Sequence, residues 1–193
     1  MKFKNLKLRL PVVTICLLLF VFSGSYSQTQ KESPPANKNY EIASAQYSEL
    51  AAQALTYFIK MDIDKWASML ADDVEYNFPD GDEGTRTKLT GKAAVLGWWS
   101  NWAKTSGVKS MTMEKPVFIP VNSVERNPYT GLSGVTVITY FSNNMDINGT
   151  PLKLRMNFNA HFNENKLIDR YYTYYDRTKI VAIMGKNILE VKK

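Results

Sequence analysis

The chain has 193 residues and a formal net charge of +6, and its composition excludes several classes of protein. Four of the 24 Lys and Arg residues, and none of the 18 Asp and Glu residues, lie in residues 1–27, so the rest of the chain is nearly neutral. A nearly neutral chain without a basic cluster has no nucleic-acid-binding footprint. With one cysteine and one histidine, an internal disulfide and a Cys/His zinc site are excluded, and we expect no metal and no cofactor.

The N-terminal segment has the three parts of a secretory signal. Four basic residues precede an apolar run over residues 12–22, and Ser25 and Ser27 are the small residues before a cleavage point at Gln28. The run is shorter than the roughly 20 apolar residues that span a bilayer. We therefore expect residues 1–27 to be a cleaved signal peptide and the protein to be secreted or periplasmic, with no membrane association after cleavage. Retention as an uncleaved anchor is the alternative.

A flexible linker is expected over residues 28–39, which are polar and contain Pro34-Pro35, and the folded domain over residues 40–193. Apolar residues recur at three- and four-residue steps over residues 47–61, which predicts an amphipathic helix. Asp62 is placed to cap a second, shorter helix that residues 72–73 close. The apolar face of this short helix is expected to carry Trp66, Met69 and Leu70.

A strand and a third helix follow. Val74, Tyr76 and Phe78 alternate with polar residues, which predicts a half-buried strand that stops at Pro79-Asp80-Gly81. Thr90 is predicted to cap the third helix. The apolar side of that helix carries Val95, Trp98, Trp99 and Trp102.

The second half of the domain is predicted to be mainly β-sheet. A strand over residues 108–121, broken at Pro116, leads into a long loop over residues 122–134 that is either a lid or a surface excursion. Asn148-Gly149 marks a hairpin turn, and residues 163–165 mark the next reversal. Between them, apolar residues from Leu152 to Phe162 alternate with polar ones, so one face is core and the other is wet. A last strand over residues 167–175 and a short terminal helix complete the domain.

Four short motifs occur in the order of a known fold: Met61-Asp62-Ile63-Asp64, Leu70-Ala71-Asp72-Asp73-Val74, Gly91-Lys92-Ala93-Ala94-Val95 and Tyr174-Tyr175-Asp176. With the order of the elements, they resemble the nuclear transport factor 2-like superfamily, which includes SnoaL-like polyketide cyclases, ketosteroid isomerases and scytalone dehydratase. The resemblance covers roughly residues 40–184. It implies an α+β, cone-like fold in which three N-terminal helices pack on a strongly curved antiparallel β-sheet, plus a short C-terminal helix.

The resemblance also places the three polar groups of the isomerases, which fall on Ala54, Phe78 and Phe158 here. Enolisation needs a base and donors aimed at the oxyanion, and Ala and Phe supply neither. Steroid-isomerase chemistry is therefore not expected, and the protein leans towards a non-enzyme.

Three weak catalytic candidates remain: Asp80, His161 and Asp169. Asp80 is expected to act as a turn former, as the Pro-Asp-Gly sequence implies. His161 follows the polar face of its strand, so we expect a surface or interface histidine that points away from the cone. Asp169 is expected to pair with Arg170 or Arg155 on the wet face.

Large side chains are expected either to line a ligand pocket in the cone or to fill it. In the resembling isomerases, the positions of Trp98 and Trp99 line the pocket. The candidate ligand-binding residues are Ala54, Phe58, Tyr76, Phe78, Trp98, Trp99, Tyr140, Met156 and Phe158.

The leading hypothesis for function is non-catalytic binding of a small apolar or aromatic molecule in the cone, or partner binding through the sheet. A SnoaL-like isomerase, cyclase or dehydratase with a different acid-base group is the alternative. The resemblance further implies a homodimer formed through the outer sheet face, where residues 153–161 would lie.

Overall fold

The computed structural model describes residues 38–81 and 85–189. The chain divides into two units, residues 1–36 and residues 37–193, and the second contains all the described structure. The predicted signal peptide and all but the end of the predicted linker lie outside the described residues. In the described ranges, no helix is long and apolar enough to cross a membrane.

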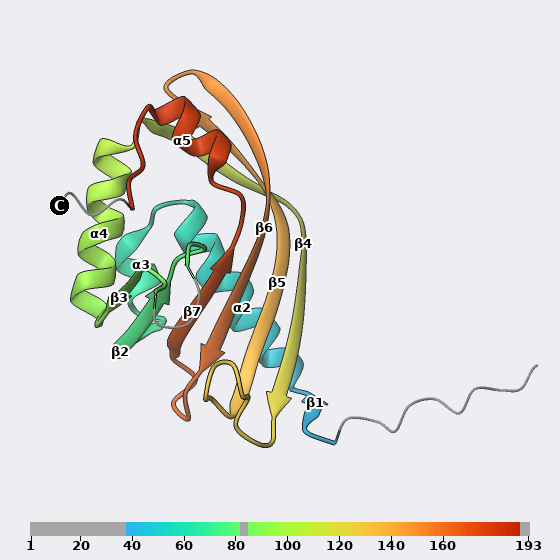
Figure 1. Cartoon of the computed structure of the whole chain (residues 1–193). Coiled ribbons are helices and arrows are strands. Elements are labelled where there is room, and N and C mark those ends of the chain that lie inside the picture. The colour runs from blue at the N-terminus through green and yellow to red at the C-terminus, as the bar shows by residue number, and fades with distance from the viewer. Residues whose placement is uncertain (1–37, 82–84, 190–193) are drawn as a thin grey trace, which may run out of the picture. The chain divides into compact units, whose positions relative to one another are not determined.

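The described part is an α+β domain with helices early, strands late and one short helix near its end (Figure 1). Its elements are β1 (Tyr40–Ile42), α2 (Ala45–Ile59), α3 (Ile63–Ala67), β2 (Leu70–Asn77), β3 (Lys88–Thr90), α4 (Lys92–Thr105), β4 (Val108–Ser123), β5 (Gly134–Ile147), β6 (Thr150–Phe162), β7 (Ile168–Tyr174) and α5 (Thr178–Met184).

The strands form one sheet in the order β1-β4-β5-β6-β7-β2-β3. Every pairing in it is antiparallel except that of β2 with β7, which is parallel, so the sheet is mixed rather than antiparallel throughout. The long strands β4, β5 and β6 curve along their length, and α2, α3 and α4 gather on one side of the sheet (Figure 1). In β4 the expected break at Pro116 is a register irregularity, where Lys115 has a φ of 50°.

Helix α2 confirms the predicted amphipathic pattern, because its buried positions recur at helical spacing along the face that packs on β4 and β5. Asp62 caps α3 as predicted, its side chain accepting a hydrogen bond from the Lys65 amide at 3.3 Å. The expected extent of α3 is wrong, however. The helix ends at Ala67, and Leu70 already pairs with Ile168 in the parallel β2–β7 ladder.

The predicted cap of α4 is also wrong. Thr90 belongs to β3, where it pairs with Glu75, and the capping position falls on Gly91. Gly91 has a φ of 89°, a left-handed conformation that costs a residue with a Cβ roughly 1–2 kcal/mol. Its amide donates to the Val74 carbonyl, which anchors the start of α4 to β2.

The β5–β6 hairpin turns at Asn148-Gly149 as predicted, and both residues have positive φ, 52° and 86°. Along β6 the predicted alternation holds, with the apolar residues from Leu152 to Phe162 buried against the helices. The core therefore lies between the inner face of the curved sheet and the three helices α2, α3 and α4.

Candidate ligand-binding site

Aromatic side chains fill most of the interior of the cone. Phe58 on α2 contacts both Trp99 on α4 and Phe158 on β6, with ring centroids 4.6 and 5.8 Å apart. Further contacts extend this cluster through Tyr76 and Phe78 at the end of β2. Because these rings pack edge-on and tilted rather than leaving a gap, the deep part of the cone is a packed core. All three isomerase-type positions are buried: Ala54 and Phe158 lie in this packed region, and Phe78 lies at its edge beside the mouth.

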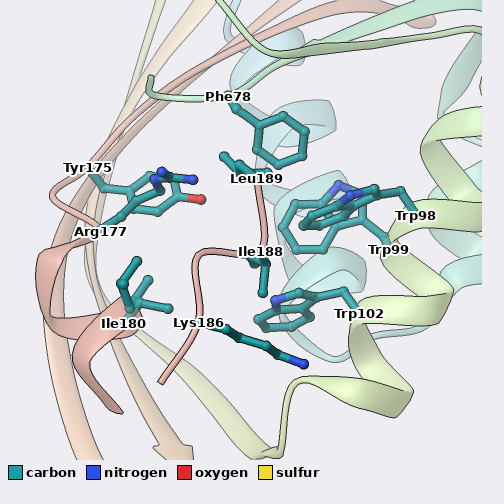
Figure 2. A pocket seen from close by; sticks show the side chains of 11 residues that line it. Phe78, Trp98, Trp99, Trp102, Tyr175, Arg177, Ile180, Lys186, Ile188 and Leu189 are labelled. Atoms are coloured by element: carbon teal, nitrogen blue, oxygen red, sulfur yellow. The ribbon is translucent and has the colours of Figure 1, made fainter. Parts of the chain in front are cut away.

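A cavity remains at the mouth of the cone, where α4 faces the chain that follows β7 (Figure 2). Trp98, Trp99 and Trp102 from α4 line one side, and Tyr175 and Arg177 line the other. Its volume is about 30 Å³. That is room for a water molecule or two, well below the roughly 300 Å³ of a typical ligand pocket.

Residues 186–189 close this cavity. Ile188 and Leu189 point into the space between Phe78 and the tryptophans (Figure 2), and Leu189 is only 8% exposed. Asn187 holds the segment in place, because its side-chain oxygen accepts one hydrogen bond from Arg177 Nη2 at 3.1 Å and another from the Leu189 amide at 3.2 Å. The closure thus depends on two apolar side chains and one side-chain hydrogen bond to Arg177.

Unpaired polar groups gather at the same place. Trp99 Nε1 and Arg177 Nη1 are buried and have no hydrogen-bond partner among the described residues. The Tyr175 hydroxyl points towards the cavity (Figure 2), and burial raises the pKa of this phenol well above its ordinary value, so it stays neutral. A buried donor without a partner costs about 1–3 kcal/mol, so these groups favour an acceptor in the cavity.

The ionisable side chains that line the cavity are Tyr175, Arg177 and Lys186. Two are cations and the third is a neutral phenol, so the described lining offers hydrogen-bond donors and positive charge, and none of its described residues is a carboxylate or an imidazole. Such an arrangement can hold an anionic or hydrogen-bond-accepting group. In the part of the chain that is described, no three His, Cys, Asp or Glu side chains come close enough together to hold a metal ion.

Asp80 lies beside the mouth but does not line the cavity. One oxygen of its carboxylate accepts a hydrogen bond from the Thr87 hydroxyl at 2.6 Å, which ties Asp80 to the residue just before β3. The other oxygen is buried without a partner among the described residues. Asp80 is also an electrostatic neighbour of Tyr175.

His161 and Asp169 form a pair on the outer face of the sheet, away from the cone. His161 Nδ1 lies 2.5 Å from Asp169 Oδ1, and His161 Nε2 lies 2.9 Å from the Ser133 carbonyl oxygen. Alternation placed His161 on the correct face, but the expectation of a surface residue is wrong: His161 is only 6% exposed because the chain at Ser133 covers it. The expected pairing of the Asp169 carboxylate with Arg170 or Arg155 is also wrong, because this carboxylate contacts His161, while Arg170 donates to the Asp169 backbone carbonyl.

The His161 ring is built to carry a proton on both nitrogens, because each nitrogen faces an oxygen acceptor. Burial lowers its pKa, but the hydrogen bonds to the Asp169 carboxylate and the Ser133 carbonyl outweigh burial, and the pKa is raised above the ordinary value of 6.5. The three catalytic candidates therefore do not converge: Asp80 lies at the mouth, and His161 and Asp169 lie on the other side of the sheet.

The residues predicted to bind a ligand separate into three groups. Phe78, Trp98 and Trp99 line the mouth cavity. A second group lies deeper, in the packed core: Ala54, Phe58, Tyr76, Met156 and Phe158. The placement of Tyr140 in the cone is wrong, because it is 49% exposed on the outer face while its neighbour Phe141 faces the core.

Several cavity residues were not predicted. Trp102 was on the apolar stripe of α4, one helical turn beyond Trp98, and that spacing was a signal that it shares the site. Tyr175 and Arg177 follow the last strand, and nothing local in the sequence indicates that they face α4. Residues 186–189 carry no periodic pattern, so their position over the mouth is a purely tertiary outcome.

The sequence matches no family model and no curated protein. Many solved structures are similar in fold. A candidate isomerase from Bacillus subtilis has 21% identity over 75% of this chain and 99% of its own, with a TM-score of 0.53. A nuclear transport factor 2-like protein of unknown function from Burkholderia pseudomallei has 17% identity over 73% and 98%, with a TM-score of 0.56. The protein TerC, co-crystallised with polyporic acid, has 16% identity over 72% and 98%, with a TM-score of 0.55.

These similarities, with the architecture described above, show that the domain has the nuclear transport factor 2-like fold. At these identities the likeness establishes the fold and not the activity. The resemblance noted from the sequence motifs is thereby confirmed for the fold.

Proposed function

We propose that this protein is a secreted, non-catalytic binding protein that takes a small aromatic molecule with an anionic or hydrogen-bond-accepting group at the mouth of the cone. The observation that carries the proposal is the pairing of an aromatic wall with unpaired donors. Trp98 and Trp99 offer flat apolar surface, while Trp99 Nε1 and Arg177 Nη1 lack partners among the described residues. A planar ring with a carboxylate or carbonyl matches both features.

None of the described residues that line the cavity is a carboxylate or a histidine, and this supports binding without turnover. Acid-base catalysis needs a group that exchanges a proton near neutral pH within hydrogen-bond reach of the substrate. The guanidinium of Arg177 has N–H donors and no acceptor, and the neutral phenol of Tyr175 is a donor rather than a base at neutral pH. TerC, which shares this fold, was co-crystallised with polyporic acid, and this is consistent with small-molecule binding by the fold.

Entry of such a ligand requires residues 186–189 to move. The closed cavity of about 30 Å³ is too small for an aromatic ring. The segment is held by Ile188, Leu189 and the Arg177–Asn187 hydrogen bond, and displacing it would free the guanidinium to meet the ligand. In this view the C-terminal segment occupies the site until a ligand replaces it.

The direct test is calorimetric titration with naphthalene-2-carboxylate and with its neutral methyl ester. The carboxylate should bind more tightly than the ester, and Arg177→Gln should weaken the carboxylate by about tenfold, the equivalent of one charge-assisted hydrogen bond, while changing the ester little. Arg155→Gln is the matched control, because Arg155 is exposed on the outer face. Failure of both probes to bind, or equal losses in the two variants, contradicts the proposal.

Secretion is proposed on the signal-like segment at residues 1–27. Expression of the full chain in a bacterium, followed by fractionation and N-terminal sequencing of the exported form, should find a chain that begins at Gln28. A product found only in the cytoplasm with residues 1–27 intact would contradict this part of the proposal.

The alternative, a SnoaL-like isomerase, cyclase or dehydratase, is favoured by one observation: the unpaired Asp80 oxygen beside Tyr175. A base at Asp80 would exchange the acidic protons of an enolisable aromatic ketone. Proton–deuterium exchange of 2-tetralone in D2O, followed by NMR, should not be accelerated by the wild-type protein if the binding proposal is correct. Acceleration that Asp80→Asn abolishes would establish the enzyme instead.

Partner binding through the sheet is the second candidate function, and we include a homodimer in it. The outer face exposes apolar side chains, with Val117 51% and Tyr140 49% exposed on adjacent strands. Two such strands could pack against a second copy of the sheet. Light scattering at low concentration should show a dimer that Asn157→Glu weakens; a monomer in both proteins would contradict it.

A further inference from the structure

The outer face of the sheet carries a groove that the cone site does not use. It lies where the loop over residues 124–133 follows β4 and curls back beside the strand ends (Figure 1). The groove has a volume of about 400 Å³, far larger than the mouth cavity. A second hollow of about 270 Å³ adjoins it and shares Tyr129, Thr130 and Tyr172 with it. Together they form a continuous depression of the size that a small ligand fills.

Accessible tyrosine rings form the walls of this groove. Tyr172 and Tyr174 come from the outer face of β7, Tyr129 comes from the loop, and Tyr40 comes from β1. Tyr129 is 47% exposed, Tyr40 41% and Tyr174 38%, so much of each ring remains open to solvent. An exposed ring of this kind offers a flat apolar face and a polar hydroxyl at the same time.

Arg86 holds three of these rings in place. Its guanidinium carbon lies 5.8 Å from the ring centroids of Tyr129 and Tyr172 and 5.2 Å from that of Tyr174. Arg86 Nη2 also donates a hydrogen bond of 2.8 Å to the Tyr129 hydroxyl. A cation packed among three rings orders them, and ordered rings lose little entropy when a ligand binds.

Hydrogen bonds within the loop over residues 124–133, and from this loop to Tyr40, hold it in place. Asn127 Oδ1 accepts from the amides of Tyr129 at 2.9 Å and Thr130 at 3.2 Å, and Asn127 Nδ2 donates to the Tyr40 hydroxyl at 3.3 Å. At its far end, the Ser133 carbonyl accepts from His161. The loop is therefore an ordered segment that forms one wall of the groove.

The described polar side chains that line the larger groove are neutral. Ser123, Thr136 and Asn159 from the sheet and Thr130 from the loop contribute hydroxyl and amide groups, and none of the described residues that line this part carries a charge. The Asn159 side-chain oxygen is buried and has no hydrogen-bond partner among the described residues. The Asn159 side-chain amide can therefore turn this oxygen towards a ligand without breaking an existing hydrogen bond to it.

We infer that this groove binds a neutral carbohydrate, such as a pyranose unit of an oligosaccharide. A pyranose ring has an apolar C–H face that packs on a tyrosine ring, and a rim of hydroxyls that both donate to and accept from amide and hydroxyl side chains. A charged ligand would find its counter-charges in the adjoining hollow, which Glu75, Arg86 and Lys88 line, rather than among the residues of the larger groove. A purely apolar ligand would leave Asn159 and the hydroxyls unpaired. A neutral polyol with apolar faces satisfies both conditions.

The test is a titration of the purified protein with cellohexaose, maltohexaose and xylohexaose, monitored by saturation-transfer NMR and calorimetry. At least one oligosaccharide should bind. Tyr174→Ala should weaken it by about tenfold, whereas Tyr174→Phe, which keeps the ring, should stay within about threefold. Tyr140→Ala is the matched control, since Tyr140 is an exposed outer-face tyrosine that lies outside the groove.

Three results would overturn the inference. One is that none of the three oligosaccharides binds. Another is that Tyr140→Ala weakens binding as much as Tyr174→Ala, which would indicate non-specific adhesion to exposed rings. The third is a dimer, seen by light scattering, in which Tyr174→Ala abolishes dimerisation and has no effect on sugar binding. Naphthalene-2-carboxylate binding should be unchanged in Tyr174→Ala in all of these cases, because Tyr174 does not line the mouth cavity, and this separates the inference from the cone proposal.

Discussion

Leu189→Ala tests whether the C-terminal segment competes with a ligand for the mouth of the cone. Leu189 is 8% exposed and lines the cavity with Phe78 and the tryptophans of α4. Truncation of a buried leucine to alanine costs about 2–5 kcal/mol, and the low end applies to a short segment that can relax. We take the packing of Leu189 to stabilise only the closed position of residues 186–189. Loss of about 2 kcal/mol of this packing free energy then shifts the equilibrium between the closed and open positions roughly 30-fold towards the open one.

A ligand that binds only the open state gains the same factor. The dissociation constant for naphthalene-2-carboxylate should therefore fall by up to about 30-fold in Leu189→Ala, measured by calorimetric titration. Leu154→Ala is the control, because Leu154 is also a leucine at 8% exposure but lies on β6 away from the cavity. It should lower the midpoint of denaturant unfolding and leave the affinity unchanged. An unchanged or weaker affinity in Leu189→Ala would refute the competition.

Three further predictions concern stability. The pKa of His161 is raised in the folded state, so the stability that His161 contributes is present below pH 6.5 and is lost as the pH rises through the folded-state pKa. The difference in unfolding free energy between wild type and His161→Gln should therefore shrink as the pH rises over that range. A difference that grows would contradict the His161–Asp169 pairing. Phe58→Ala should cost about 3–5 kcal/mol in urea unfolding, because Phe58 contacts Trp66, Trp99 and Phe158; a loss under 1 kcal/mol would mean that the cone is not packed. Gly149→Ala should cost about 1–2 kcal/mol in the same assay from its φ of 86° alone, as nothing crowds the position, and no loss would argue against the turn geometry.

Local patterns predicted the parts of the fold that local energetics determine. The Asn148-Gly149 turn followed from two residues that tolerate positive φ, and the inner face of β6 followed from strict alternation. The cap at Asp62 followed from side-chain chemistry. These features need only a few neighbouring residues, so the sequence carries enough information to identify them.

Long-range pairing decided the features that were missed. Leu70, which the local sequence pattern placed in a helix, lies in a strand because it pairs with Ile168 in the parallel ladder. This pairing joins segments that are almost a hundred positions apart in the sequence. The three-residue strand β3 exists only because it pairs with β2, and this pairing removed Thr90 from the role of a cap. His161 sits on a face that alternation predicts to be wet, yet a loop that carries no such pattern covers it.

The aromatic core of the cone and the outer groove lie on opposite faces of the same strands, and this separates the groove from the mouth cavity on the core side. On β6, Phe158 points into the aromatic core while Asn159 faces the groove. On β7, Tyr171 is buried against Trp66 and Tyr172 lines the groove. Because successive residues of a strand point to opposite faces, a substitution at either site leaves the ladder between them intact. A one-residue slip of β7 would exchange both faces at once, so the Trp66–Tyr171 hydrogen bond of 3.2 Å, which fixes that register from the core side, should matter to both sites. Selective loss of one binding activity is therefore expected of side-chain variants, and joint loss of both is expected only where the register of β7 is disturbed.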